Sequence, residues 1–394
     1  MASRPAEPRR ARGRPPAGIV LPFVIFWSTL DRSLILPLIP AVAGDLDASV
    51  ALTAAAITTH AIAYAALQLL WGPLSTRWGR IRVLWTSTSI AALACTAAAL
   101  APDITVFLIA RTVSGGAFAA TFAAVLTYFG DTLPLARRPA AMSNLATAAA
   151  LALAAGTLVA GAVVTMIGWR WVFGGFAIVT AALVPLLASL REAPDAGARP
   201  LRVQVIALAR SRWALAVCAL VAGEGVLLIG IYNLLPVALQ QTGADAFTAG
   251  GVTAAFGVAV VVVSQVMKLA VGRVSAAALL AAGGVLTAGA MVLLAATVSP
   301  VSVLLSATLM GTGWALAHTT LQTWMTDAAV ASRALGMTLF SISLMMGGAV
   351  GTAVGTGPVA GGSFTALFTA AAVLAAGFAA AAFSVRRRYR ESGA

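Results

Sequence analysis

Twelve long runs of apolar residues constrain this chain more than any other feature of its sequence. They cover roughly residues 19–41, 50–71, 83–101, 104–127, 143–167, 169–190, 213–236, 248–270, 276–297, 301–324, 335–357 and 362–384. A run of about 20 apolar residues is long enough to cross the hydrocarbon core of a bilayer as an α-helix. With 60% of its residues hydrophobic, the chain is too apolar for a soluble domain. The sequence therefore predicts an all-α integral membrane protein with twelve transmembrane helices.

The basic residues predict how these helices are oriented. If the N-terminus is cytoplasmic, every Lys and Arg except Arg32, Arg111 and Arg170 falls on the cytoplasmic side. This positive-inside asymmetry predicts that both termini are cytoplasmic, with the basic tails 1–18 and 385–394 near anionic lipid headgroups. The net charge of +13 is therefore explained by topology and not by nucleic-acid binding. The abundance of Arg and Ala indicates GC-rich DNA, which favours a bacterial source and therefore a bacterial inner (plasma) membrane.

The two halves of the chain repeat each other in register. Arg77, Asp131 and Arg137 recur 196 positions later as Arg273, Asp327 and Arg333. Duplicated six-helix halves are typical of transporters, whose substrate site lies near the midplane between the halves. The sequence predicts two pseudo-symmetric six-helix bundles, at 19–190 and 213–384, joined by a cytoplasmic linker at 191–212.

The segment "WGPLSTRWGRIR", between the second and third runs, concentrates glycine and arginine in a chain that is only 9% charged. Gly72 and Gly79 permit a sharp turn between antiparallel helices. Arg77 and Arg80 hold the turn in the cytoplasm and reach for carboxylates at neighbouring helix ends.

The segment contains no acid, so Asp131 is the carboxylate available to its arginines, as Asp327 is for Arg273. We expect these charges to form a conformational latch that biases a two-state transporter. A simple topology anchor is the alternative.

These motifs carry a resemblance to a known family. "GPLSTRWGRIR" resembles the loop between helices two and three of the major facilitator superfamily, with Thr76 in place of the family's Asp. "RTVSGGAFAA" resembles the fourth-helix motif. "AGTLVAG" and "LDRSLILPLIPAVAGDL" resemble the fifth and first helices of its drug:proton antiporter branch, although Ala152 and Thr157 replace the Gly and Pro of the fifth helix. The resemblance implies a twelve-helix proton-coupled antiporter.

Small residues recur at a four-residue spacing in two runs. Gly347 and Gly351 share one face of the eleventh run, and Gly156 lies on such a face of the fifth, with Gly161 nearby. Small residues allow membrane helices to approach closely. The pattern predicts either fixed packing or surfaces that slide as the two halves rock.

A few ionisable residues lie inside the predicted spans, where a charge costs about 2.5–3.5 kcal/mol on insertion scales. Counting about 1.5 Å per residue places Asp31, Arg111, Glu224 and His60 in one layer, about 10–14 Å from the outer face. A carboxyl group in an apolar cavity retains its proton more readily than in water, and a nearby Arg opposes this. We therefore expect this layer to couple protons to substrate, with Asp31 as the leading candidate. His318, nearer the cytoplasmic end, is not included.

The sequence favours proton-coupled efflux of small lipophilic or cationic compounds, by a monomer that uses the proton gradient and needs no cofactor. The alternative is an importer or facilitator of a small metabolite, since Arg32 and Arg111 could bind an organic anion. No nucleotide loop, metal cluster or catalytic triad appears, so we do not expect an enzyme.

Overall fold

The computed structural model describes residues 17–134, 138–192, 206, 208–270, 274–329 and 333–392, and its regular elements are all helices. In the first half these are α1 (Ala17–Leu34), η1 (Leu36–Leu38), α2 (Ile39–Asp45), α3 (Val50–Trp78), α4 (Arg80–Ala99), α5 (Ile104–Thr132), α6 (Arg138–Ile167) and α7 (Trp169–Ala188). In the second half they are α9 (Arg212–Gly225), η3 (Val226–Ile231), α10 (Tyr232–Gln241), α11 (Ala246–Thr253), α12 (Ala255–Ala270), α13 (Ala276–Ala296), α14 (Pro300–Ala328), α15 (Arg333–Ala360) and α16 (Phe364–Ser392). They form twelve helical spans that are long and apolar enough to cross a membrane, which confirms the prediction.

Short polar residues mark where many of the helices begin. A side-chain oxygen accepts a hydrogen bond from a backbone N–H of the first turn at Ser49, Asp103, Ser211, Asp245, Ser275 and Ser299. These caps satisfy donors that have no partner within the helix. Gly79 and Gly168 make the tightest turns, because each alone separates two helices and has a φ near +100° that favours glycine.

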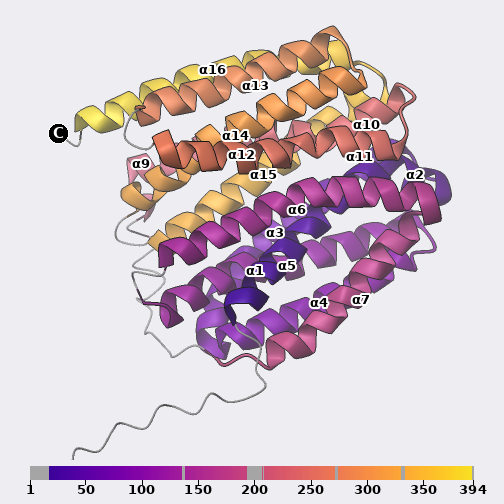
Figure 1. Cartoon of the computed structure of the whole chain (residues 1–394), viewed down its shortest axis with the longest axis horizontal. Helices are drawn as coiled ribbons and strands as arrows, with labels where there is room; N and C mark the ends of the chain where they lie inside the picture. Colours follow the sequence, from indigo (N-terminus) through magenta and orange to yellow (C-terminus); the bar gives the residue numbers. More distant parts are fainter. Residues whose placement is uncertain are drawn as a thin grey trace, which may run out of the picture.

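The two halves use the same packing plan (Figure 1). In the first half, α1 packs on α6, α3 on α5, and α4 on both α5 and α7. In the second half the equivalent pairs are α9 with α15, α12 with α14, and α13 with α14 and α16. The halves meet where α3 packs on α15 and where α6 packs on α11 and α12. The repeat in the sequence is therefore a repeat in space.

The first span of each half is irregular. In the first half α1 gives way to the 3₁₀ turn η1, which contains Pro37, before the chain continues as α2. In the second half, the π-helical segment η3 follows directly after Glu224 and Gly225. Proline removes a backbone donor, and π-helical turns are frequent at functional sites. Both breaks lie a few residues beyond an intramembrane acid.

The predicted packing glycines lie at close helix contacts, but most of these contacts are within one half. Gly156 faces Ser33 of α1, and Gly347 and Gly351 face the backbone of α9 and η3. Gly161 alone of the four crosses to the other half, where a Cβ atom would collide with the backbone of Ala246 on α11. The glycines of the eleventh span therefore pack within one half, and of these four only Gly161 lies at the interface between the halves.

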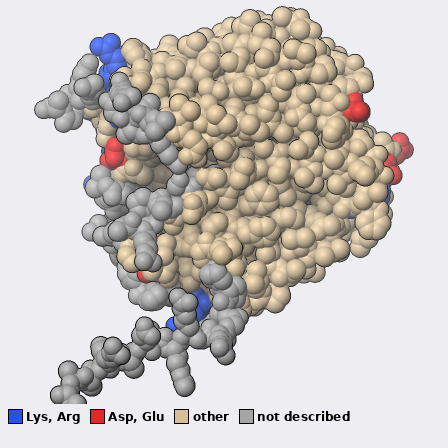
Figure 2. Space-filling view, viewed as in Figure 1, with Lys and Arg blue, Asp and Glu red and all other residues tan. Residues whose placement is uncertain are grey.

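The molecular surface separates apolar from charged regions. Figure 2 shows coloured charged residues at the two ends of the visible face and a broad uncharged band between them. At the end opposite to the start of α1, Arg170 pairs with Asp45. This distribution agrees with a multi-pass membrane protein whose apolar band faces lipid.

Candidate transport site

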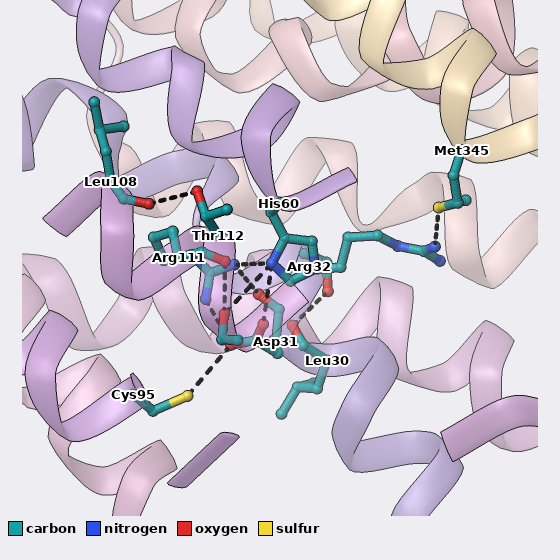
Figure 3. Close-up of polar contacts among 11 residues, drawn as sticks. Leu30, Asp31, Arg32, His60, Cys95, Leu108, Arg111, Thr112 and Met345 are labelled. Carbon is teal, nitrogen blue, oxygen red and sulfur yellow. Dashed lines mark hydrogen bonds and ion pairs between the residues drawn. The ribbon is translucent and has the colours of Figure 1, made fainter. Parts of the chain in front are cut away.

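Asp31 and Arg111 form a buried ion pair inside the first half (Figure 3). The Arg111 Nη1 and Asp31 Oδ1 atoms are 2.7 Å apart, and the two side chains are 1% and 0% exposed. Arg111 Nη2 also donates to the backbone carbonyl of Asp31 at 3.2 Å. The sequence placed these residues at one depth on different helices, and the structure brings them into contact. Because a guanidinium stays protonated, Arg111 gives the Asp31 carboxyl group a fixed positive neighbour.

His60 completes this cluster from α3. Its Nδ1 lies 3.3 Å from Arg111 Nη2 and 3.7 Å from Asp31 Oδ2. Since a guanidinium can only donate, His60 Nδ1 accepts and the ring proton resides on Nε2. The cluster is compact because Gly115 of α5 has no side chain, as a Cβ atom there would lie 2.8 Å from the His60 ring. Gly115 belongs to the "RTVSGGAFAA" segment, which gives that motif a physical role.

Glu224 does not join this cluster. Its Oε2 atom lies 3.0 Å from Nδ1 of His318 on α14, and its carboxylate is fully buried. The other oxygen, Oε1, has no hydrogen-bond partner among the described residues. The single layer predicted from the sequence is thus two separate clusters, because helix depth alone does not say which side chains face each other.

The neighbours of His318 fix its tautomer. Gln322 places its amide nitrogen 3.1 Å from His318 Nε2, so with this amide orientation Nε2 accepts and Nδ1 carries the proton that points to Glu224. Trp314 stacks on the ring at 4.0 Å. Sequence reasoning set His318 aside. The sequence did contain a signal for this site, because the four-residue spacing of His318 and Gln322 places two polar side chains together on one face of a membrane helix.

Arg32 points away from its neighbour Asp31. Figure 3 shows its side chain extending towards Met345 of α15, and its Nη1 donates to the thioether sulfur at 3.2 Å. It borders a small cavity between the halves, lined by Arg32, Leu36 and Leu153 of the first half and by Ile229, Tyr232 and Phe256 of the second. The cavity measures about 10 Å³, which is room for about one water molecule.

The predicted latch is present in part. Arg80 Nη2 lies 3.0 Å from Asp131 Oδ2, as an ion pair that is not aligned as a hydrogen bond. Arg77 is exposed, with no ion pair to a described residue. The expectation for Gly72 is wrong. It lies within α3, which continues to Trp78, so Gly79 alone makes the turn.

The acid missing from the loop is supplied by Glu192, four residues beyond the end of α7 at Ala188. Its carboxylate accepts from the backbone N–H groups of Arg80, Ile81 and Arg82 at 2.6–3.3 Å. The N-terminus of a helix carries unpaired donors and a partial positive charge, which a carboxylate stabilises. Sequence reasoning missed this contact because it joins residues more than a hundred positions apart.

The second half shows no matching latch among the described residues. Arg273 lies outside them, and Asp327 is exposed. No group of His, Cys, Asp and Glu side chains within the described ranges could hold a metal ion.

Comparisons with known proteins agree with this architecture. The family model "Major Facilitator Superfamily" matches residues 21–352. An "MFS-type transporter" of Claviceps purpurea (strain 20.1) is 29% identical over 161 residues, which is 39% of this chain and 28% of that protein. "Efflux pump dotC" of Dothistroma septosporum (strain NZE10 / CBS 128990) is 27% identical over 155 residues, 39% of this chain and 27% of that one. The chain thus matches less than a third of the length of these curated relatives.

Solved structures share the fold at low sequence identity. A crystal structure of the peptide transporter POT in complex with sulfate has a TM-score of 0.77 at 15% identity, covering 96% of both chains. A D-xylose-proton symporter has a TM-score of 0.71 at 16% identity, covering 92% of this chain and 95% of that one. With twelve spans in two matching halves and a family model over most of its length, this chain belongs to the major facilitator superfamily of membrane transporters.

Proposed function

We propose that this protein is a secondary transporter that exports small lipophilic compounds in exchange for protons by alternating access. The observation that carries the proposal is the buried Glu224–His318 pair, an acid with a titratable partner inside the membrane region. The similarity to "Efflux pump dotC" supports the direction of transport. We infer further that the proton gradient is the energy source and that no cofactor or catalytic step is needed.

The chemistry of Glu224 suits reversible protonation. With His318 neutral, the pair carries one negative charge and has no permanent cation to compensate it. A buried charge of this kind is costly, so proton uptake relieves it whenever the site opens to a compartment that supplies protons. Asp31 differs because Arg111 compensates it permanently. The prediction that Asp31 carries the proton remains open beside this one, and both are testable by substitution.

The seam between the halves is suited to alternating access. We propose that the bundles 19–190 and 213–384 move as units, with the linker 191–212 between them. At one end of the seam the backbones are in close contact, since Gly250 of α11 faces the carbonyl of Thr157 and Gln240 donates to the carbonyl of Pro37 at 3.1 Å. Separation there would need these contacts to break, which is the expected cost of changing access.

The orientation belongs to the same proposal. The basic residues around Arg77 to Arg82 and Arg386 to Arg388 fall at the end where α1 begins and α16 finishes. By the positive-inside rule we propose that this end is cytoplasmic. We further propose a bacterial inner membrane, as expected from the abundance of Arg and Ala. Cysteine labelling in intact cells tests it. An accessible C-terminus outside the cell would contradict the proposal.

Transport in inverted vesicles with an imposed pH gradient tests the function. The vesicle lumen corresponds to the cell exterior, so an exporter should accumulate its substrate inside when the lumen is acidic. We expect at least one lipophilic compound of a screened panel to accumulate, and an uncoupler to abolish the accumulation. Equal transport with and without the gradient would identify a facilitator. Normal coupling in Glu224→Gln would remove that residue as the proton site.

A further inference from the structure

Arg32 is a charged group that the proton-exchange scheme does not use. Of the two arginines that the sequence placed inside the spans, Arg111 is paired with Asp31, whereas Arg32 has no carboxylate within ion-pair distance among the described residues. The one hydrogen bond that its guanidinium makes with a described residue is to the Met345 sulfur, a weak acceptor. An arginine in the membrane region without an anionic partner is costly to keep there, so its position needs an explanation.

The surroundings of Arg32 identify where a partner would bind. The guanidinium crosses the seam from α1 to α15, and the adjacent cavity takes its walls from both halves. Apart from Arg32, the cavity is lined by apolar side chains and by three uncharged polar ones, namely Leu36, Leu153, Ile229 and Phe256, and Ser33, Tyr232 and Asn233. A largely apolar wall with one fixed charge favours a ligand that has an apolar body and one charge of the opposite sign.

Neighbouring charges do not cancel this preference. The Asp31 carboxylate is in direct contact with Arg111, which leaves the guanidinium of Arg32 able to form a two-pronged contact with a carboxylate or sulfonate. An organic cation would be repelled at the same place. The sequence named both Arg32 and Arg111 as residues that could bind an organic anion, and in the structure only Arg111 is paired with a carboxylate among the described residues.

We propose that Arg32 is the substrate-binding cation of this transporter and that its substrates are small amphipathic organic anions. This proposal rests on the proposed transport function, and it replaces the cationic substrates expected from the sequence. The anion contacts Arg32 while its apolar body lies between the halves, where both bundles touch it. The cavity is too small for such a body in this conformation, so binding requires the halves to separate. An inside-negative membrane potential drives an anion outward, which agrees with export.

Equilibrium binding of two charge-matched probes tests the proposal without any proton gradient. Naphthalene-1-sulfonate and trimethyl-(1-naphthyl)ammonium have the same ring and permanent charges of opposite sign. Binding of each to the purified full-length protein in nanodiscs of neutral lipid is measured by equilibrium dialysis. We expect the wild type to bind the sulfonate more tightly than the ammonium by about tenfold or more. Arg32→Gln should lose this preference, and Arg32→Lys should keep part of it.

A matched control and the contrary outcomes complete the test. Arg388→Gln removes an exposed arginine near the end of α16 and should leave the preference unchanged. Size-exclusion chromatography of each variant confirms that it is folded. Failure of the wild type to bind the sulfonate, equal binding of both probes, or a preference retained in Arg32→Gln would overturn the proposal. If the wild type prefers the sulfonate but shows no proton-driven accumulation in the vesicle assay, only the proton-exchange scheme is contradicted.

Discussion

The first span of each half carries a buried acid that faces a base on the fourth span of the same half, but the two bases differ. Asp31 on α1 meets Arg111 on α5, whereas Glu224 on α9 meets His318 on α14. An arginine keeps its charge in every state, whereas a histidine can be neutral or charged. The duplicated fold therefore keeps the placement of the acid and its basic partner, and the two halves differ in whether that partner is permanently charged.

The largest expected effect is the loss of protein stability on breaking the Asp31–Arg111 pair of the first half. Asp31→Asn leaves Arg111 buried without a counter-charge, which should destabilise the protein by about 3–5 kcal/mol. Thermal unfolding followed by tryptophan fluorescence in detergent measures this. The double variant Asp31→Asn/Arg111→Met removes both charges and should recover most of the loss. An Asp31→Asn protein as stable as the wild type would show that the pair is not structural.

The next largest loss of stability is expected on breaking the latch of the first half, the Arg80–Asp131 ion pair. Asp131→Asn removes the partner of the largely buried Arg80 side chain, with an expected loss of about 1–3 kcal/mol and slower transport of a panel substrate. Asp327→Asn is the matched control, because Asp327 is exposed and should cost much less. Equal effects of the two variants would mean that the second half has an equivalent latch.

A smaller effect is expected from removing the groups that cap the N-termini of corresponding helices in the two halves. The start of α4 is capped from a distance by Glu192, whereas α13 is capped locally by Ser275, whose hydroxyl accepts from Ala278 N–H at 3.2 Å. Glu192→Ala and Ser275→Ala should each lower the unfolding free energy by about 0.5–2 kcal/mol. Of the two, only Glu192→Ala should also alter protease accessibility of the α3–α4 turn. If Ser275→Ala alone were destabilising, the Glu192 contact would have no role in stability.

The smallest effect on stability is expected at Glu224. In Glu224→Gln the side-chain oxygen still accepts from His318 Nδ1, so the loss should be about 1 kcal/mol or less. The same unfolding assay measures it beside Asp31→Asn. A loss as large as that of Asp31→Asn would indicate that Glu224 is ionised and held by a protonated His318, which makes the two clusters alike.

The sequence predicted most of the fold because its signals are local. Apolar length specifies the spans, and the Arg77/Arg273 repeat specifies the two halves. The contacts that make the site are different. Their similar depth in the membrane predicted that Glu224 and Asp31 belong to one layer. Which side chain Glu224 contacts depends instead on the rotation of its helix about its own axis and on its packing against α14, and these bring it to His318.

Two further features lay outside local reasoning. Glu192 acts on a helix whose first residue is 112 positions earlier, and no periodicity links them. Gly72 was assigned to the turn on residue type alone, while α3 continues through it and through Pro73 as helix. Arg32 was recognised as an intramembrane charge, but its lack of a carboxylate partner follows only from where Asp31 and Arg111 meet.

The most direct test of the proposed coupling counts the protons that the purified protein in nanodiscs releases when a transported panel compound binds. Wild type is compared with Glu224→Gln and with Asp31→Asn/Arg111→Met. We predict that Glu224→Gln releases about one proton fewer than the wild type and that the Asp31/Arg111 double variant releases as many as the wild type. Unchanged release in Glu224→Gln, together with its loss in the double variant, would contradict this prediction and return proton coupling to Asp31.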